Sequence, residues 1–217
     1  MATSRFSYYD RLDAAAQRVY RKSDAITSVP LSAPEPIRPG IDALREALAT
    51  GDRAVVAAGC VWLCRAILAD LGVSPVAIEV LEERPRGGYG ELHGLYTWEP
   101  DKPDELPRIQ VWMRTAAHAR VVAFKTFLRT LLHELGHHLD FHYFELPDSY
   151  HTQGFYQRET SLFRQLVPTA LTPPTPSARP PAPASKAALP VKAPPKSTHR
   201  EKEMALAKLH PRLPGID

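Results

Sequence analysis

One segment, residues 119–141, constrains the fold more than any other part of the sequence. Its large apolar residues recur at steps of three and four, which is the spacing of one face of an α-helix. This spacing predicts a helix whose apolar face lies in the core of the domain. The residues that form the apolar face are Phe124, Leu128, Leu131, Leu135 and Leu139.

The opposite face of this predicted helix carries polar residues in the pentapeptide HELGH, which contains His133, Glu134 and His137. Residues four apart on a helix lie about 40° apart and one turn apart, so the two imidazoles project toward a common point. Glu134 is rotated off that line, so its carboxylate can reach a metal-bound water without competing for the metal. The pattern predicts a catalytic zinc ion (Zn²⁺) with two histidine ligands and Glu134 as general base.

The third ligand of such an ion has to come from outside the pentapeptide, since catalytic zinc sites use three protein ligands. His151 and Glu159 share one face of the next predicted helix, residues 152–166. We favour His151 as the ligand, because a residue at a helix start that follows a loop can approach the ion. Glu159 is then the alternative ligand, or a residue that orients one of the ligands.

Three further polar residues lie on the predicted active-site helix. Asp140 shares the metal face, one turn beyond His137, and is better placed to orient His137 than to reach the same ion. His138 and His142 lie well around the helix from that face. We therefore expect Asp140 to act through His137, and we expect neither of these two histidines to bind the metal.

The pentapeptide together with His151-Thr152-Gln153-Gly154-Phe155 resembles the zincin metallopeptidases, and especially SprT-like proteins and minimal gluzincins. In SprT-like proteins the third ligand is a histidine in an H-G-x-x-F/W context. That context maps onto His151 and Phe155, with Thr152 in place of the usual glycine. In gluzincins the third ligand is a glutamate on the following helix, which maps onto Glu159. The resemblance covers roughly residues 75–167.

This resemblance implies a zinc metallopeptidase that hydrolyses peptide bonds with a zinc-activated water. It also implies that the strand before the active-site helix, residues 108–114, is an edge strand that pairs with an extended peptide substrate. An ordinary covered strand is an equally weighted interpretation of that segment. The zinc ribbon of many SprT-like proteins is missing, because no CxxC pairs follow the motif.

The expected fold class is α+β, with a small mixed sheet packed on the HExxH helix. Three segments read as strands, because apolar and β-branched residues alternate in them or run continuously. They are residues 76–81, 91–98 and 108–114. Two helices are expected before the sheet, over residues 41–49 and 54–71.

Proline content divides the chain into three parts. Residues 1–40 form a proline-containing lead-in with a short helix over 9–21, and residues 41–168 form the zincin-like domain. Residues 169–217 are a Pro/Ala/Lys-rich tail, predicted to be disordered because it has no apolar period. A helix over 199–209 within the tail would be marginal alone.

Charge and cysteine content indicate a soluble cytoplasmic protein. Residues 171–217 carry eight Lys and Arg against three Asp and Glu, so the folded part is not basic and nucleic-acid binding is not indicated for it. The two cysteines, Cys60 and Cys64, are too few for a disulfide framework, and we interpret them as buried, inert thiols. The N-terminus lacks a secretory signal, and the apolar stretch 54–64 is too short for a bilayer. We expect no membrane partner, although the tail is able to bind an unknown partner.

Two other functions remain open at this point. The first is a non-catalytic interaction protein that keeps a zinc site as a fold element, although a purely structural site has no need of Glu134. The second is a zinc hydrolase that acts on a non-peptide amide, which sequence does not separate from a peptidase. The residue that stabilises the oxyanion also stays open, and the candidates are Tyr143, Tyr150, Tyr156 and Arg158.

Overall fold

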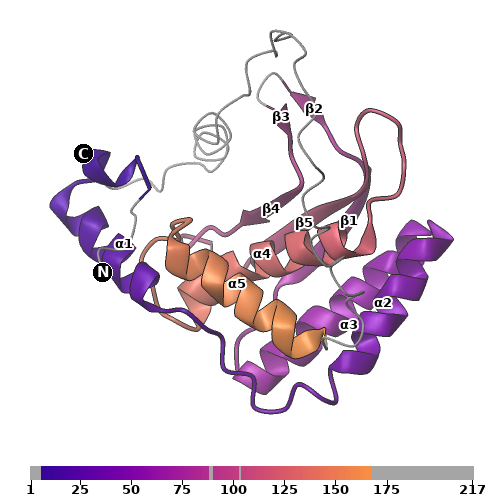
Figure 1. Cartoon of the computed structure of the whole chain (residues 1–217), viewed down its shortest axis with the longest axis horizontal. Coiled ribbons are helices and arrows are strands. Elements are labelled where there is room, and N and C mark those ends of the chain that lie inside the picture. The colour runs from indigo at the N-terminus through magenta and orange to yellow at the C-terminus, as the bar shows by residue number, and fades with distance from the viewer. Residues whose placement is uncertain (1–5, 88–89, 103, 168–217) are drawn as a thin grey trace, which may run out of the picture. The chain divides into compact units, whose positions relative to one another are not determined.

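The computed structural model describes residues 6–87, 90–102 and 104–167, which fall within one compact unit, Met1–Val167 (Figure 1). Within them the fold is mixed α/β, compatible with the expected α+β class, and has five α-helices and a small three-stranded sheet. The predicted disordered tail, residues 169–217, and the predicted helix over 199–209 lie outside the described residues.

The three-stranded sheet has the order β1-β5-β4. Strand β1 (Ala77–Glu83) runs parallel to β5 (Arg108–Arg114), and β4 (Gly94–Thr97) runs antiparallel to β5. Two short strands between β1 and β4, β2 (Arg86–Gly87) and β3 (Gly90–Glu91), pair with each other as a separate antiparallel ribbon. Strand β4 therefore lies at one edge of the sheet and β1 at the other.

Strand β5 has the predicted bounds but not the edge position that the zincin resemblance implies. It pairs with β1 on one side and with β4 on the other, so it is the central strand. Its residues Val111, Trp112 and Met113 are buried in succession, which means that both faces of the strand are covered. A continuous apolar run of this kind is typical of a central strand. The strand with an outer edge near the predicted site is β4.

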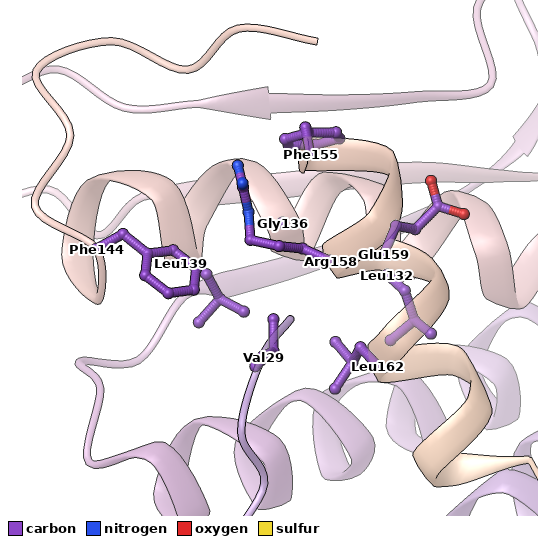
Figure 2. A pocket seen from close by; sticks show the side chains of 9 residues that line it. All are labelled: Val29, Leu132, Gly136, Leu139, Phe144, Phe155, Arg158, Glu159 and Leu162. Carbon is purple, nitrogen blue, oxygen red and sulfur yellow. The ribbon is translucent and has the colours of Figure 1, made fainter. Parts of the chain in front are cut away.

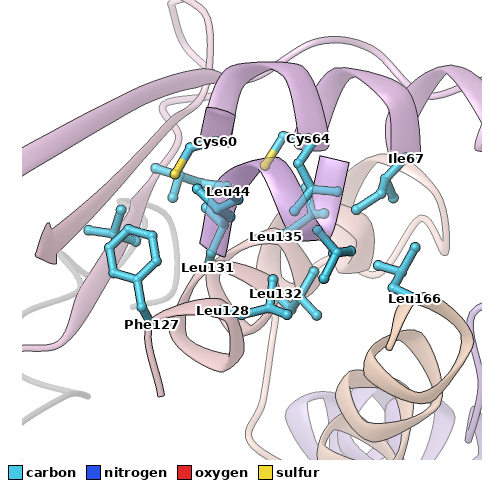
Figure 3. Close-up of a cluster of buried hydrophobic side chains, with 14 of the residues drawn as sticks. Leu44, Cys60, Cys64, Ile67, Phe127, Leu128, Leu131, Leu132, Leu135 and Leu166 are labelled. Atoms are coloured by element: carbon cyan, nitrogen blue, oxygen red, sulfur yellow. The ribbon is translucent and has the colours of Figure 1, made fainter. Parts of the chain in front are cut away.

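Helices cover the sheet and enclose one hydrophobic core (Figure 3). Helix α3 (Arg53–Leu71) packs on β1, and α4 (Phe124–His142) packs on β4 and β5. Helix α2 (Arg38–Thr50) packs on α3, and α5 (Gln153–Leu166) packs on α4. All five residues of the predicted apolar stripe of α4 pack in or against this core. Because the stripe faces the core, the opposite face of α4 points away from the core.

Helix α3 is apolar on most of its surface, and one side of it lies in the core while Val55 and Trp62 on the other side are about half exposed. By length and composition alone it would be able to cross a membrane. Its inner side chains, which include Cys60, Cys64 and Ile67, are nevertheless buried against the other helices, as a core helix requires (Figure 3). Both cysteines are free thiols, and burial raises the pKa of Cys64 to about 12.

The helix of the N-terminal lead-in is shifted along the chain relative to the prediction. Helix α1 (Ala14–Ala25) begins after Asp13, whose carboxylate accepts a hydrogen bond from the backbone N–H of Ala16. It therefore overlaps the predicted range of 9–21 but begins and ends several residues later. Helix α2 also starts earlier than predicted, since Pro39 occupies its first turn, where a missing N–H costs nothing. Helix α1 packs against α5, and this contact brings the lead-in to the predicted site.

Candidate metal centre

Three histidine side chains converge where α4 meets the start of α5. Nε2 of His133 lies 2.9 Å from Nε2 of His151, which in turn lies 3.1 Å from Nε2 of His137. His133 and His137 come from the polar face of α4, and His151 from the loop that leads into α5. One nitrogen from each of the three residues is therefore available at a common point.

The other ring nitrogen of His133 is held by a carboxylate. Nδ1 of His133 lies 3.2 Å from Oε2 of Glu159, and Arg129 donates a 2.8 Å bond to the other oxygen of that carboxylate. Burial lowers the pKa of His133, but the bond to Glu159 and the surrounding carboxylates raise it, and the net direction is upward. Since a carboxylate only accepts hydrogen bonds, Nδ1 of His133 carries a proton, and in the neutral imidazole Nε2 then carries the lone pair.

The other ring nitrogen of His137 is held through a serine. Nδ1 of His137 lies 2.7 Å from the hydroxyl of Ser149, which itself donates a 2.8 Å bond to Oδ2 of Asp140. Ser149 donates its one hydroxyl proton to Asp140, so the serine oxygen accepts a hydrogen bond from Nδ1–H of His137. His137 therefore has the same tautomer as His133, with the Nε2 lone pair facing the common point. Asp140 acts on His137 through Ser149, not by direct contact.

This donor set fits a zinc ion. Two nitrogens bound to one tetrahedral zinc ion lie about 3.3 Å apart, because each bond is about 2.0–2.1 Å long. The Nε2 separations of 2.9 and 3.1 Å are close to that value. Nε2 of each of the three histidines lies at the common point, within reach of one ion. A cation that accepts all three lone pairs satisfies the whole group, and carboxylate partners on metal-binding histidines are the usual second layer of such sites.

His151 is fixed in place by its neighbours on both sides. The next residue, Thr152, caps α5 by accepting a hydrogen bond from the backbone N–H of Phe155. The hydroxyl of Tyr8 donates a 3.0 Å bond to the carbonyl of His151, and the ring of Tyr156 stacks on the imidazole with 5.9 Å between centroids. The third histidine is thus set by a helix cap, by an aromatic ring and by the N-terminal lead-in.

Helix α1 approaches α5 closely at Gly154. The backbone N–H of Gly154 donates a 3.0 Å bond to the carboxylate of Asp24, and a side chain at Gly154 would lie 2.7 Å from the carbonyl oxygen of Ser23. The absence of a side chain at this position is therefore what allows the two helices to meet. The contact lies three residues from His151, so the packing of α1 bears on the position of that histidine.

A buried arginine connects the same region of α1 to α4. Arg158, 3% exposed, donates to the carbonyl oxygens of Ser23 and Ile26 and forms a 2.7 Å ion pair with Asp140. Figure 2 shows Arg158 and Glu159 extending from α5 in different directions beside a small cavity. A continuous chain of hydrogen bonds therefore runs from the end of α1 through Arg158, Asp140 and Ser149 to His137.

Glu134 lies against strand β4. Its side chain is buried, and its carboxylate accepts a hydrogen bond from the backbone of Tyr96. Burial raises the pKa of Glu134 to about 7, against the lowering influence of His133 and of the Tyr96 backbone. A carboxylate whose pKa lies near neutral pH both takes and gives up protons readily, which is the property required of a general base.

The other residues considered as ligands from the sequence do not face the common point of the three Nε2 atoms. Glu159 contacts the Nδ1 side of His133, while the three Nε2 atoms face the common point. His138 and His142 point elsewhere, and both contact the hydroxyl of Tyr96 at 3.3 Å. Among the oxyanion candidates, Tyr156 lies against His151, whereas Arg158 is committed to Asp140 and to α1.

Several residues of this centre escaped the sequence analysis. Ser149, Tyr8 and Gly94 lie in segments with no motif, and each reaches the site through the fold. The arginine partner of Glu159, Arg129, is one turn before His133 on α4, and the four-residue spacing was an available signal. For Ser149 the only local signal is its place in the short loop between the two site helices.

Comparisons of this chain with protein-family models, with curated proteins and with solved structures found no match. The case for a function therefore rests on the geometry of the residues themselves.

Proposed function

We propose that this protein is a zinc-dependent metallopeptidase in which His133, His137 and His151 hold the metal and Glu134 is the general base. The observation that carries the proposal is the convergence of three Nε2 atoms, two of them with tautomers fixed by Glu159 and Ser149. A zinc ion with three protein ligands supplies an activated water and polarises the substrate carbonyl.

The residues around the centre have separate roles in the proposed reaction. Glu134 takes the proton of the attacking water on its carboxylate and then gives it to the leaving amine. The pKa of about 7 suits both steps near neutral pH. Glu159 and Ser149 keep the imidazoles of His133 and His137 oriented throughout, because each holds the Nδ1 proton of its histidine.

The proposed substrate is an extended peptide that pairs with the outer edge of β4. In the described part of the chain, β4 is paired only on its β5 side. The strand also lies directly against Glu134, so a peptide added along its outer edge would pass the general base. Backbone hydrogen bonds of this kind bind substrates with little regard to sequence, and pockets for side chains then add specificity.

Two features favour an enzyme over a protein that keeps zinc only as a fold element. A structural site has no use for a buried carboxylate beside the metal, and burying Glu134 carries a desolvation penalty that a functional role explains. Structural sites also favour four ligands, often cysteines. We further propose that the protein works in the cytoplasm, as its two buried, unpaired cysteines suggest.

The test is hydrolysis of a library of internally quenched peptides by the zinc-loaded protein, with Glu134→Gln as the matched variant. Glutamine keeps the shape of the side chain but does not act as a base. The proposal predicts cleavage by the wild type and a loss of about a hundredfold or more in Glu134→Gln at unchanged zinc content. Equal cleavage by both proteins would contradict the role of Glu134. An absence of cleavage across peptides, with cleavage of acylated amines instead, would favour the non-peptide amide hydrolase.

A further inference from the structure

Strand β4 presents two residues to Glu134 that the proposed reaction does not yet use, Gly94 and Tyr96. We propose that they form a cradle that positions the carboxylate of Glu134, so that both are positioning residues for the general base. This inference rests on the proposed function, since it assigns the residues that hold its base in place. It also gives a role to the second pair of histidines on α4, His138 and His142.

Gly94 leaves the space that the carboxylate fills. A methyl group added at Gly94 would lie 2.5 Å from Oε1 and 2.7 Å from Cγ of Glu134, and 2.8 Å from Cγ2 of Thr130. Carbon and oxygen atoms do not approach so closely without displacement. Any side chain at position 94 therefore moves the Glu134 carboxylate, because the end of that side chain is the part able to move.

Tyr96 supplies the bond that holds the carboxylate in that space. Its backbone donates a hydrogen bond to Glu134 from the same strand, two residues beyond Gly94. Residues two apart on a strand face the same way, so the open space at Gly94 and the side chain of Tyr96 lie on one face of β4, and the donor is the backbone of the strand itself. The carboxylate is thus bounded by Gly94 and tied by Tyr96.

The side chain of Tyr96 fixes the strand relative to α4. Nε2 of His138 lies 2.9 Å from the carbonyl of Ser74, which only accepts, so this nitrogen carries the proton and Nδ1 is an acceptor. The phenol of Tyr96 then donates to Nδ1 of His138, and the phenol oxygen accepts from Nε2–H of His142. Every member of this network has one defined direction. The whole Tyr96 residue is 4% exposed, so the network anchors β4 from inside the domain.

A carboxylate held in this way meets the geometric demand on a general base. A misplacement of about 1 Å in a catalytic group can reduce the rate a hundredfold. Gly94 bears directly on Glu134, because the nearest atoms to a methyl group at this position belong to Glu134 and Thr130. The ring of Tyr96, by contrast, also stacks on His137, with 6.3 Å between the ring centroids. A change at position 94 should therefore affect catalysis while the metal stays bound.

The first experiment is a double-mutant cycle on the metal-free protein, in which the melting temperature of each variant is measured by thermal unfolding. All proteins carry Thr130→Ser, which removes the second contact and keeps the hydroxyl that bonds Thr126. Gly94→Ala should lower the melting temperature by about 3–8 °C when Glu134 is present, and by a much smaller amount when Glu134→Ala is added. If Gly94→Ala does not fold while Glu134 is present, recovery of folding on addition of Glu134→Ala supports the cradle in the same way. An equal fall in both backgrounds would overturn the cradle.

The second experiment measures zinc content, kcat and KM of the zinc-loaded protein with the quenched peptides. Gly94→Ala should lower kcat about a hundredfold with zinc content and KM unchanged. Tyr96→Phe, which keeps the backbone donor but loses the anchor, should lower kcat less and also spare KM. Gly59→Ala on α3, whose methyl group would have Leu44 as its nearest neighbour, is the control and should keep wild-type kcat. Unchanged kcat in Gly94→Ala overturns this inference alone, whereas a wild type without zinc or cleavage overturns the proposed function as well.

Discussion

Nδ1 of His137 donates a 2.7 Å hydrogen bond to the hydroxyl of Ser149, and this bond decides which nitrogen of His137 faces the candidate metal centre. Ser149 in turn donates to Asp140, so its oxygen has no other way to bond the imidazole than as an acceptor. A loop serine thus connects a buried carboxylate to a histidine of the candidate metal centre.

Ser149→Ala should weaken zinc binding without unfolding the domain. The change removes the bond that orients His137, and partners of this kind are worth about 10- to 100-fold in metal affinity. Competition with a chromophoric zinc chelator measures the affinity. Ser32→Ala is a suitable control, because Ser32 is exposed and uses its backbone N–H, rather than its side chain, to bond Asp70. Wild-type affinity in Ser149→Ala would contradict the role given to this serine.

Arg158→Met should strongly destabilise the metal-free protein. Asp140 is fully buried, and the change leaves its charge without the 2.7 Å ion pair to Arg158. Breaking a buried pair on one side costs about 3–5 kcal/mol of unfolding free energy, which urea titration measures. Addition of Asp140→Asn to Arg158→Met should recover part of the loss, since the unpaired charge is then gone. A cost below about 1 kcal/mol for Arg158→Met would show that the pair is not tightly coupled.

Acid should destabilise the fold through His138. Burial lowers the pKa of His138 to about 4 from an ordinary value of 6.5. The folded state therefore prefers the neutral imidazole, so this contribution to stability is complete above pH 6.5 and is lost as the pH falls toward 4. The full loss is about 3 kcal/mol for this one group. Urea titrations of the metal-free protein across this range should show a shallower pH dependence for His138→Gln than for the wild type, and parallel curves would refute the assignment.

Cys60 and Cys64 should resist thiol reagents in the native state. Burial raises the pKa of both thiols, to about 12 for Cys64, so almost no thiolate exists at pH 8. A disulfide reagent such as Ellman's should label both residues quickly in concentrated urea and only slowly in buffer, at a rate set by unfolding. Rapid labelling of the native protein would mean that α3 is not the core helix described above.

The sequence was sufficient for those parts of the molecule that local spacing determines. The leucine stripe predicted α4 because helix faces repeat at three and four residues, and the alternation of apolar residues from Arg108 to Arg114 predicted β5. The predicted helix over 152–166 matched α5, Gln153–Leu166, to within one residue. These signals placed His133 and His137 on a helix with nearly correct bounds, and His151 just before the next helix.

The parts that sequence did not provide depend on contacts between distant segments. The bond between Asp24 and Gly154 joins residues 130 positions apart, and no local pattern announces it. The contact of Gly94 with Glu134 depends on β4 lying over α4, which follows from the sheet order and not from either segment. Whether residues 108–114 form an edge strand or a covered strand stayed open for the same reason, since pairing order is a property of the whole sheet.

The most direct measurement is the zinc content of the purified protein by elemental analysis, for the wild type beside His133→Ala, His151→Ala and Glu159→Gln. Three histidine ligands predict about one zinc per chain in the wild type. The zinc should be lost in both alanine variants and retained, with weaker binding, in Glu159→Gln, because Glu159 contacts His133 at Nδ1. Loss of zinc in Glu159→Gln with retention in His151→Ala would make Glu159 the third ligand. A wild type that binds no zinc after reconstitution would contradict the metal centre itself.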